Sequence, residues 1–496
     1  MSAFDLNRRR VLQALLAAGA AGATSASFAR KTRAAADKTK FLITFPLFGG
    51  GAIIDSFLPI KASESNNATT IDCFPDDQVT ALSGSDIRCA DPIITSILGF
   101  DFSDSPVALP LSGFGEKHKH EMMVTTLTGT SVNHAIAQRR ALSGGGAWSG
   151  RTLQEIVAAE YGQGFALPNV NMSSLGYLER GSDTSLPAEA YAEPIPNALL
   201  KPLSFSGSQG IKGAPSKDMM KLARGVRDEH LDANGEFYSA FYRSKKLDLW
   251  SKQRLIAQNI EDKGLIDEVM FIKNSPPQIP LEEYGLHSAP EADDLLLLFP
   301  DMFNDPLEQQ AALACLLIKR KVSVAVTISA SFAPVNGGPL GLKSTPLAFD
   351  LSHQDHRFVQ AFMWTRCLGI ADKVITFLKA NVYDEETGET FWDRTMMHFP
   401  TDFGRDKRRL GGAPFWGTGH ELNNGHLTVS PMVNGNTVLG GVDPDTGMTY
   451  GFDLESGDAD AGRNTAEGES FAGLLQAIGI DTSVVDLPNV PAMRKG

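Results

Sequence analysis

The chain has 496 residues and a formal charge of −13, with 42% apolar residues and only 4 cysteines. These values exclude a disordered polymer, a collagen and a small disulfide-rich scaffold, and they predict a globular protein with a full hydrophobic core. The acidic balance excludes nucleic acid as the main partner, because binding to phosphate groups needs a basic surface.

The first 36 residues differ from the rest of the chain in charge. They carry a net charge of +5, so the remaining residues carry −18. Arg8 and Arg9 precede a mild apolar run, Val11–Ala23, which is shorter than the roughly 20 residues of a membrane span and typical of a signal-peptide core. Paired arginines at this place predict the twin-arginine class of leader.

We therefore expect a twin-arginine signal peptide over 1–36 and a mature chain that begins at Asp37. The implied partner is the twin-arginine translocase, and the implied location is the periplasm or the exterior. We expect no stable transmembrane span, because the other apolar runs, such as Leu295–Phe299, are far too short to cross a membrane.

The mature chain alternates predicted strands with predicted helices. Apolar and β-branched runs predict strands at 40–48, 120–127, 321–329 and 395–400. Apolar residues at helical spacing predict helices over 307–319 and 354–379, the second capped by Ser352. This alternation predicts an α/β fold with a mostly parallel sheet sandwiched by helices, whose functional loops follow the carboxyl ends of strands.

One long segment does not follow this alternation. Residues 175–215 are rich in Pro, Gly and Ser and predict a loop, whereas 215–265 are charged and predict helix. We expect a loop-rich and helical insertion at about 175–290 within a single domain over 37–496.

Two cysteines flank a short loop-like segment. Because an exported protein folds in an oxidising compartment, we expect a disulfide between Cys73 and Cys89, worth roughly 3 kcal/mol. Cys315 and Cys367 lie in apolar helical stretches, where we expect buried thiols.

Histidines and carboxylates gather in three short segments, 349–356, 401–405 and 417–426. Imidazole and carboxylate are the ligands of zinc and related divalent ions. Asp350 and His353 can reach one point where a loop enters a helix, and Asp402 leaves a strand end. The alternative is that each residue only caps a helix or stabilises a turn. The sequence has no phosphate-binding Gly-rich motif, no G-x-S-x-G elbow and no C-x-x-C pair.

On these residues the chain resembles the DUF1501 family of exported bacterial proteins, which belongs to the alkaline phosphatase/sulfatase-like superfamily. The resemblance spans roughly residues 40–445. It is carried by the leader, Gly49-Gly50-Gly51 with Asp55-Ser56, Asn133-His134, Trp148–Leu153, Asp350–His353, Thr401–Arg405, and Gly417–Glu421 in competition with Asn424-Gly425-His426.

The resemblance implies an alkaline-phosphatase-like fold with one or two divalent ions, which could be zinc, manganese, calcium or magnesium. The ligands that it implies are Asp55, Asp350, His353, Asp402, and either His420 or His426. The catalytic residues that it implies are Ser56 as nucleophile, His134, and Arg405 or Arg151 at an oxyanion.

Two functions remain open on this basis. The first is a metal-dependent exported hydrolase of phosphate or sulfate esters. The second is a non-catalytic exported binding or assembly protein on the same fold. Departures from the family pattern motivate the second, since Asp402 stands in place of Glu and Gly419 stands in place of Asp before the final histidine. A third alternative is a polysaccharide- or envelope-associated protein with other chemistry.

Overall fold

The structure is a computed structural model, and it divides into two compact units, Met1–Lys40 and Phe41–Gly496. It describes residues 38–172, 180–202, 215–232, 235–244, 247, 254, 264–272, 286–330, 348–409 and 416–495. The predicted signal peptide, with Arg8 and Arg9, lies outside the described residues. Every element discussed below belongs to the second unit.

An eight-stranded sheet forms the centre of this unit, in the order β10-β9-β11-β1-β14-β17-β8-β18. Its strands are β1 (Phe41–Thr44), β8 (Met122–Thr128), β9 (Asn169–Asn171), β10 (Glu193–Pro194), β11 (Ala325–Thr327), β14 (Thr395–Phe399), β17 (Asn423–Val429) and β18 (Thr437–Leu439). Five of its seven strand pairs are parallel, and β17 runs antiparallel to both of its neighbours. The prediction of a mixed α/β fold with a mostly parallel sheet is confirmed.

All four predicted strands lie in this sheet, mostly with shorter bounds. β1 is fully buried and packs between β11 and β14, which explains its continuous apolar sequence. The sequence did not reveal β17, because Asn423-Asn424-Gly425 reads as a turn. In the structure β17 pairs with β8 along its whole length, so tertiary pairing overrides this local preference.

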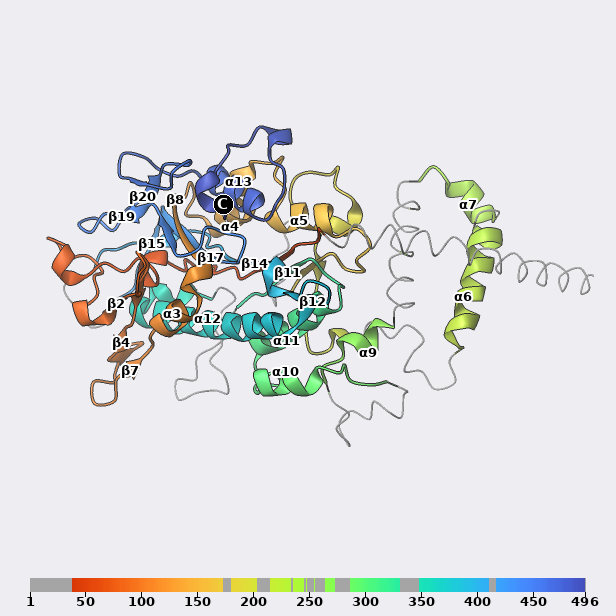
Figure 1. Ribbon diagram of the computed structural model, residues 1–496, viewed down its shortest axis with the longest axis horizontal. Helices are drawn as coiled ribbons and strands as arrows, with labels where there is room; N and C mark the ends of the chain where they lie inside the picture. Colours follow the sequence, from red (N-terminus) through yellow and green to blue (C-terminus); the bar gives the residue numbers. More distant parts are fainter. Residues whose placement is uncertain are drawn as a thin grey trace, which may run out of the picture. The chain divides into compact units, whose positions relative to one another are not determined.

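Helices cover both faces of the sheet (Figure 1). On one face lie α4 (His134–Ser143), α5 (Leu153–Tyr161) and α13 (Glu467–Ala477), and on the other α11 (Pro306–Lys319) and α12 (His356–Ala380). α5 contacts β1 and β11, α13 contacts β8, and α11 and α12 contact each other. The central strands are therefore buried on both sides.

The two predicted helices are present as α11 and α12. Asp305 caps α11 by accepting a hydrogen bond from the Leu307 amide at 2.9 Å. Asp355, not the predicted Ser352, caps α12 by accepting from the Phe358 amide at 3.2 Å. Ser352 lies instead inside a preceding 3-10 turn, η12 (Asp350–His353).

The region of the predicted insertion, about 175–290, is described only in part. Its described helical elements are the 3-10 turn η7 (Ala188–Ala190), α6 (Lys217–Val226), the π-helical turn η9 (Arg227–Asp232), α7 (Glu236–Phe241) and α9 (Leu265–Val269). β10 comes from the same region, yet it pairs with β9 in the central sheet, and α9 buries Leu265 and Val269 in the core. Part of this region is therefore built into the main domain. Among the described helices, none combines the length and apolar character that a membrane crossing requires.

The disulfide predicted between Cys73 and Cys89 is not formed, since both residues are free, buried thiols. Cys73 packs with Ile60 and Ile71 in a small cluster, whereas Cys89 belongs to the main core. Burial raises the pKa of both thiols, which suppresses the reactive thiolate. Cys315 and Cys367 are buried in α11 and α12, as predicted.

Candidate metal centre

A glycine turn begins the site just beyond β1. Gly49 and Gly50 have φ angles of +91° and +83°, in the left-handed region. A Cβ atom on Gly49 would lie 2.5 Å from the Asp350 amide nitrogen, and one on Gly50 would lie 2.6 Å from Nε of Arg405. Only glycine permits both the backbone angles and these close approaches, so the turn packs directly against the segments that carry Asp350 and Arg405.

The carboxylate of Asp402, which follows β14, is bound to this turn. Its Oδ1 accepts hydrogen bonds from the amides of Gly49 at 3.1 Å and Gly50 at 2.9 Å, and its Oδ2 lies 2.8 Å from Nδ1 of His134. The side chain has no solvent exposure. Asp402 was predicted as a metal ligand, but the structure places it behind the site, as a support for His134.

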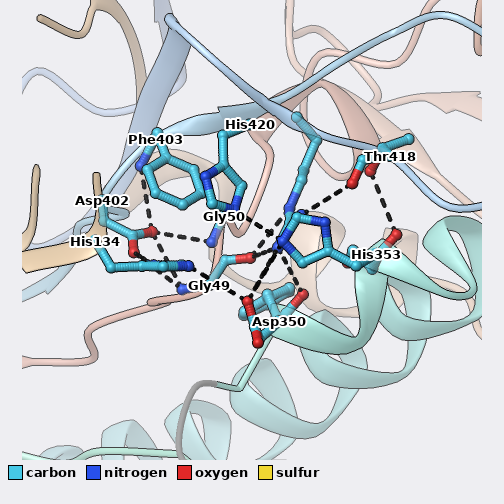
Figure 2. Close-up of polar contacts among 12 residues, drawn as sticks. Gly49, Gly50, His134, Asp350, His353, Asp402, Phe403, Thr418 and His420 are labelled. Carbon is cyan, nitrogen blue, oxygen red and sulfur yellow. Dashed lines mark hydrogen bonds and ion pairs between the residues drawn. The ribbon is translucent and has the colours of Figure 1, made fainter. Parts of the chain in front are cut away.

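Four side chains meet in front of Asp402: His134, Asp350, His353 and His420, which we call the three-histidine site (Figure 2). One potential ligand atom from each lies within 4.8 Å of the others. Oδ1 of Asp350 is 3.4 Å from Nε2 of His134 and 3.7 Å from Nε2 of His353, and the Nε2 atoms of His353 and His420 are 2.8 Å apart. Tetrahedral zinc bonds of 2.0–2.1 Å would place ligand atoms about 3.3 Å apart, so this spacing fits one ion.

Separate elements deliver these four side chains. His134 is the first residue of α4, which follows β8, and Asp350 and His353 stand three residues apart on η12. His420 lies in β16 (His420–Glu421), directly opposite Arg405 in β15 (Gly404–Arg405). Helix starts and strand ends thus converge on one point, as expected for an α/β active-site edge.

Hydrogen bonds to the other ring nitrogens set the tautomers of two histidines. Nδ1 of His420 lies 2.8 Å from the carbonyl oxygen of Val132, which can only accept, so this nitrogen carries a proton. Nδ1 of His134 faces the Asp402 carboxylate and is protonated for the same reason. In the neutral form of each ring, Nε2 then presents a lone pair to the site, which is the usual arrangement of metal-binding histidines.

The charges of the site show how a proton and a metal ion would compete. Burial lowers the pKa of His134, but hydrogen bonds to Asp350 and Asp402 outweigh it and raise the pKa to about 9. The hydrogen bond to His134 lowers the pKa of Asp350. Burial lowers the pKa of both His353 and His420, which favours their neutral, ligating forms. His134 therefore carries a proton that a divalent ion would displace.

The site is open to solvent on one side and packed on the other. The side chains of Asp350 and His353 are 39% and 43% exposed. Behind them the Phe403 ring stacks on the His420 ring, with centroids 4.0 Å apart, and lies 4.7 Å from the His134 ring. A Cβ added to Gly419, the residue before His420, would meet no atom within 4 Å.

Arg405 supports the loops of the site rather than reaching into it. Its buried guanidinium donates to the carbonyl oxygens of Gly49, Phe349 and Thr418, the last two at 3.2 Å. Burial lowers its pKa to about 10, which still leaves it charged. The role predicted for Arg405, contact with an oxyanion, does not match this geometry, because the guanidinium makes four hydrogen bonds to backbone carbonyls and lies 3.9 Å from Oδ1 of Asp350. Arg151, the other candidate, pairs with Asp183 at 2.7 Å.

Asp55, a predicted ligand, belongs to a different and fully buried group. Its Oδ2 lies 2.5 Å from Nζ of Lys407, and its Oδ1 lies 3.1 Å from Nε2 of His356. Burial raises the pKa of Asp55, but the charges of His356 and Lys407 dominate and hold it well below 3.8. The ligand set implied by the resemblance is therefore split between two places.

Two further predicted residues lie away from the three-histidine site. Ser56 is buried and donates to the carbonyl oxygen of Ile53 at 3.1 Å, so the predicted nucleophile is not accessible. His426 lies inside β17, with Nε2 2.5 Å from Oγ of Ser470, and burial lowers its pKa to about 3. Of the two histidines that the sequence left open, His420 is the one at the site.

The sequence did not reveal Gln138, Asp72 or Lys407, which shape these sites. His134 was predicted, but as a catalytic residue, whereas its Nε2 atom belongs to the ligand set. Its helical neighbour Gln138, one turn later, approaches Asp402 with Nε2 at 3.4 Å from Oδ2, a contact that i,i+4 spacing could have suggested. Asp72 and Lys407 carried no signal, because their partners lie hundreds of residues away.

Comparison of this chain with protein-family models, with curated proteins and with solved structures finds no match.

Proposed function

We propose that the three-histidine site holds one divalent metal ion and that the protein is an exported, metal-dependent hydrolase of phosphate or sulfate esters. The observation that carries this proposal is the pair of Nδ1 contacts, from His134 to Asp402 and from His420 to Val132, which turn both Nε2 atoms toward Asp350 and His353. Three imidazoles and one carboxylate favour zinc among the divalent ions, with manganese as an alternative.

The charge of the site favours an anionic substrate. Asp350 is the one carboxylate among the four ligands, so a bound divalent ion leaves a net charge of about +1. Asp402 and Arg405, just behind the ligands, offset each other. When bound, such an ion neutralises charge on a phosphate or sulfate ester and polarises its oxygen atoms.

The protein's own residues then hold the ion and keep the loops around it in place. His134, Asp350, His353 and His420 fix the position of the ion, and Arg405 fixes the three loops around it. Since Ser56 is buried, we propose that water, rather than Ser56, attacks the ester. The exposed side chains of Asp350 and His353 support entry of the substrate from their side.

We also propose the alkaline-phosphatase-like fold and the export route. The mostly parallel sheet, and the site at the carboxyl ends of β1 and β14, support an alkaline-phosphatase-like fold and the resemblance to DUF1501 proteins. The paired arginines Arg8 and Arg9 support export through the twin-arginine translocase to the periplasm or beyond.

Hydrolysis of simple esters tests this function. Protein purified from the periplasm would be stripped of metal, reloaded with zinc or manganese, and assayed on aryl phosphate mono- and diesters and an aryl sulfate. We expect turnover only after reloading, and its loss in His353→Ala with the fold unchanged. Turnover that persists in the stripped protein would contradict the proposal.

The burial of Ser56 favours a second candidate, a non-catalytic exported binding or assembly protein. In that case the site would bind metal without hydrolysing any of these esters, and a stable partner would co-purify from the periplasm. Metal-dependent turnover lost in His353→Ala would exclude this candidate.

A further inference from the structure

A second group of metal-type ligands lies inside the protein, separate from the three-histidine site. Asp55, Asp72 and His356 each offer one ligand atom, and these atoms lie within 4.8 Å of one another. All three side chains are almost completely buried, with at most 1% exposure. Two carboxylates and an imidazole make up a ligand set for zinc or manganese. We call these three residues the buried cluster.

The positive charge at the buried cluster comes from the chain itself. Nζ of Lys407 lies 2.5 Å from Oδ2 of Asp55 and 3.8 Å from Oδ2 of Asp72, and its side chain is 3% exposed. The Asp72 amide donates to the Lys407 carbonyl at 2.7 Å, which fixes the two segments side by side. Arg357 pairs with the other oxygen of Asp72, Oδ1. Lys407 and Arg357 thus face the two carboxylates, and the His356 ring contacts both of them.

One ligand atom of the cluster is left without a hydrogen bond. Oδ2 of Asp72 is buried and has no hydrogen-bond partner, although Nε2 of His356 lies only 2.9 Å away. That nitrogen forms its hydrogen bond to Oδ1 of Asp55. A buried carboxylate oxygen without a donor is costly unless a nearby positive charge stabilises it. The oxygen instead faces two basic groups, Nε2 of His356 and Nζ of Lys407 at 3.8 Å, as a ligand of a cation would.

We propose that Asp55, Asp72 and His356 form a divalent-cation-type site in which the ammonium group of Lys407 takes the place of the ion, and that removing this group lets one divalent ion bind. Without Lys407 the two carboxylates keep Arg357 and the His356 ring as partners, and the space of the ammonium lies open between the three ligand atoms. A divalent ion in that space would displace the proton of His356 and take the Asp72 oxygen as a ligand.

Metal content tests this proposal in the full-length mature protein. Wild type, Lys407→Ala, Lys407→Met and Lys407→Ala/Asp72→Asn would be stripped with chelator, incubated with Mn²⁺ or Zn²⁺ alone, desalted, and measured by elemental mass spectrometry. We expect Lys407→Ala to hold one ion per chain more than wild type. Lys407→Met fills the space of the ammonium, and the double variant removes the unpartnered oxygen, so neither should gain an ion.

The readout is the metal content of each variant minus that of wild type. It therefore tests the buried cluster whether or not the three-histidine site binds metal. Lys407→Ala could fold only with metal present, because the Asp55 carboxylate loses the ammonium that lies 2.5 Å from it. In that case refolding with and without Mn²⁺, followed by near-ultraviolet circular dichroism, gives the answer. Metal-dependent recovery with one extra ion supports the proposal. Equal metal content in Lys407→Ala and wild type, or failure to refold in either condition, overturns it.

Discussion

Nδ1 of His134 lies 2.8 Å from Oδ2 of Asp402, and this contact joins residues 268 positions apart in the chain. Because the carboxylate accepts, Nδ1 carries the proton and Nε2 faces Asp350. The same carboxylate holds the amides of the glycine turn after β1. One buried side chain therefore links the first strand of the sheet to the orientation of a candidate metal ligand.

Replacing Asp402 by Asn should weaken metal binding without removing a ligand. Asn keeps the size of the side chain but loses the charge that orients and polarises His134, and such outer partners are worth about 10- to 100-fold in metal affinity. Competition with a chelating dye measures this change. Asp104→Asn, at an exposed loop position, is the matched control and should leave the affinity unchanged. Equal affinity in Asp402→Asn and wild type would show that this support does not operate.

His420→Ala and His426→Ala should behave in opposite ways. His420→Ala removes one of four ligand atoms at a partly exposed position, so metal content should fall while stability stays nearly constant. His426→Ala leaves the buried hydroxyl of Ser470 without its partner and opens a cavity, which should cost about 1–3 kcal/mol with metal content unchanged. Metal analysis and urea unfolding separate the two. Loss of the ion in His426→Ala alone would reverse the assignment.

Arg405→Lys should destabilise the protein even though it keeps the charge. Lysine cannot donate to the carbonyls of Gly49, Phe349 and Thr418 from one planar group. The loss of these buried bonds should lower the free energy of unfolding by about 2–4 kcal/mol and weaken metal binding, because all three loops border the site. Arg408→Lys is the control, since that side chain is 82% exposed. Equal unfolding midpoints for the two variants in urea would argue against this role.

Gly49→Ala should disrupt the site more than the same change elsewhere. At Gly49 the left-handed φ and the 2.5 Å approach to the Asp350 amide act together. We therefore expect Gly49→Ala to lower the free energy of unfolding by more than about 2 kcal/mol and to reduce metal binding. Gly84 has φ +64° but no atom within 4 Å of an added Cβ, so Gly84→Ala should cost only about 1 kcal/mol. Thermal unfolding of both variants checks the comparison. A smaller loss in Gly49→Ala than in Gly84→Ala contradicts it.

The buried pair of Asp55 and His356 predicts a pH dependence of stability. The folded pKa of Asp55 lies below its ordinary 3.8, so its contribution is present above that pH and is lost as the pH falls through the folded value. Burial alone would lower the pKa of His356, but Asp55 and Asp72 raise it above 6.5, so its contribution is full below pH 6.5 and is lost as the pH rises through the folded value. Both contributions are therefore complete between these limits.

Urea unfolding of wild type and Asp55→Asn across pH checks this dependence. The stability difference between them should be largest near about pH 5 and should shrink as the medium is acidified below about pH 3.8, because only the wild type then loses the Asp55 charge. A difference that stays constant down to the acid limit would contradict the argument.

The sequence predicted the fold class well, because its signals are local. β1 and β14 are apolar runs of the right length, and α11 and α12 show apolar residues at helical spacing. The order of the strands depends on pairing between distant segments, which no local pattern encodes. The same holds for the antiparallel strand β17, whose first residues resemble a turn.

The candidate site could be predicted only in part for the same reason. Asp350 and His353 share one helical turn, so their spacing already suggested a common target. The choice between His420 and His426 depends on whether a residue lies in a central strand or at a solvent-facing edge. The group that holds Asp55 could not be foreseen, because it is completed by Lys407, 352 residues away.

The metal content of the purified mature chain tests the central claim most directly. The account predicts one divalent ion per chain by elemental mass spectrometry, lost in His353→Ala/His420→Ala while the near-ultraviolet circular dichroism stays native. A wild-type protein with background metal content, and no rise in melting temperature on addition of zinc, manganese, calcium or magnesium, would contradict it.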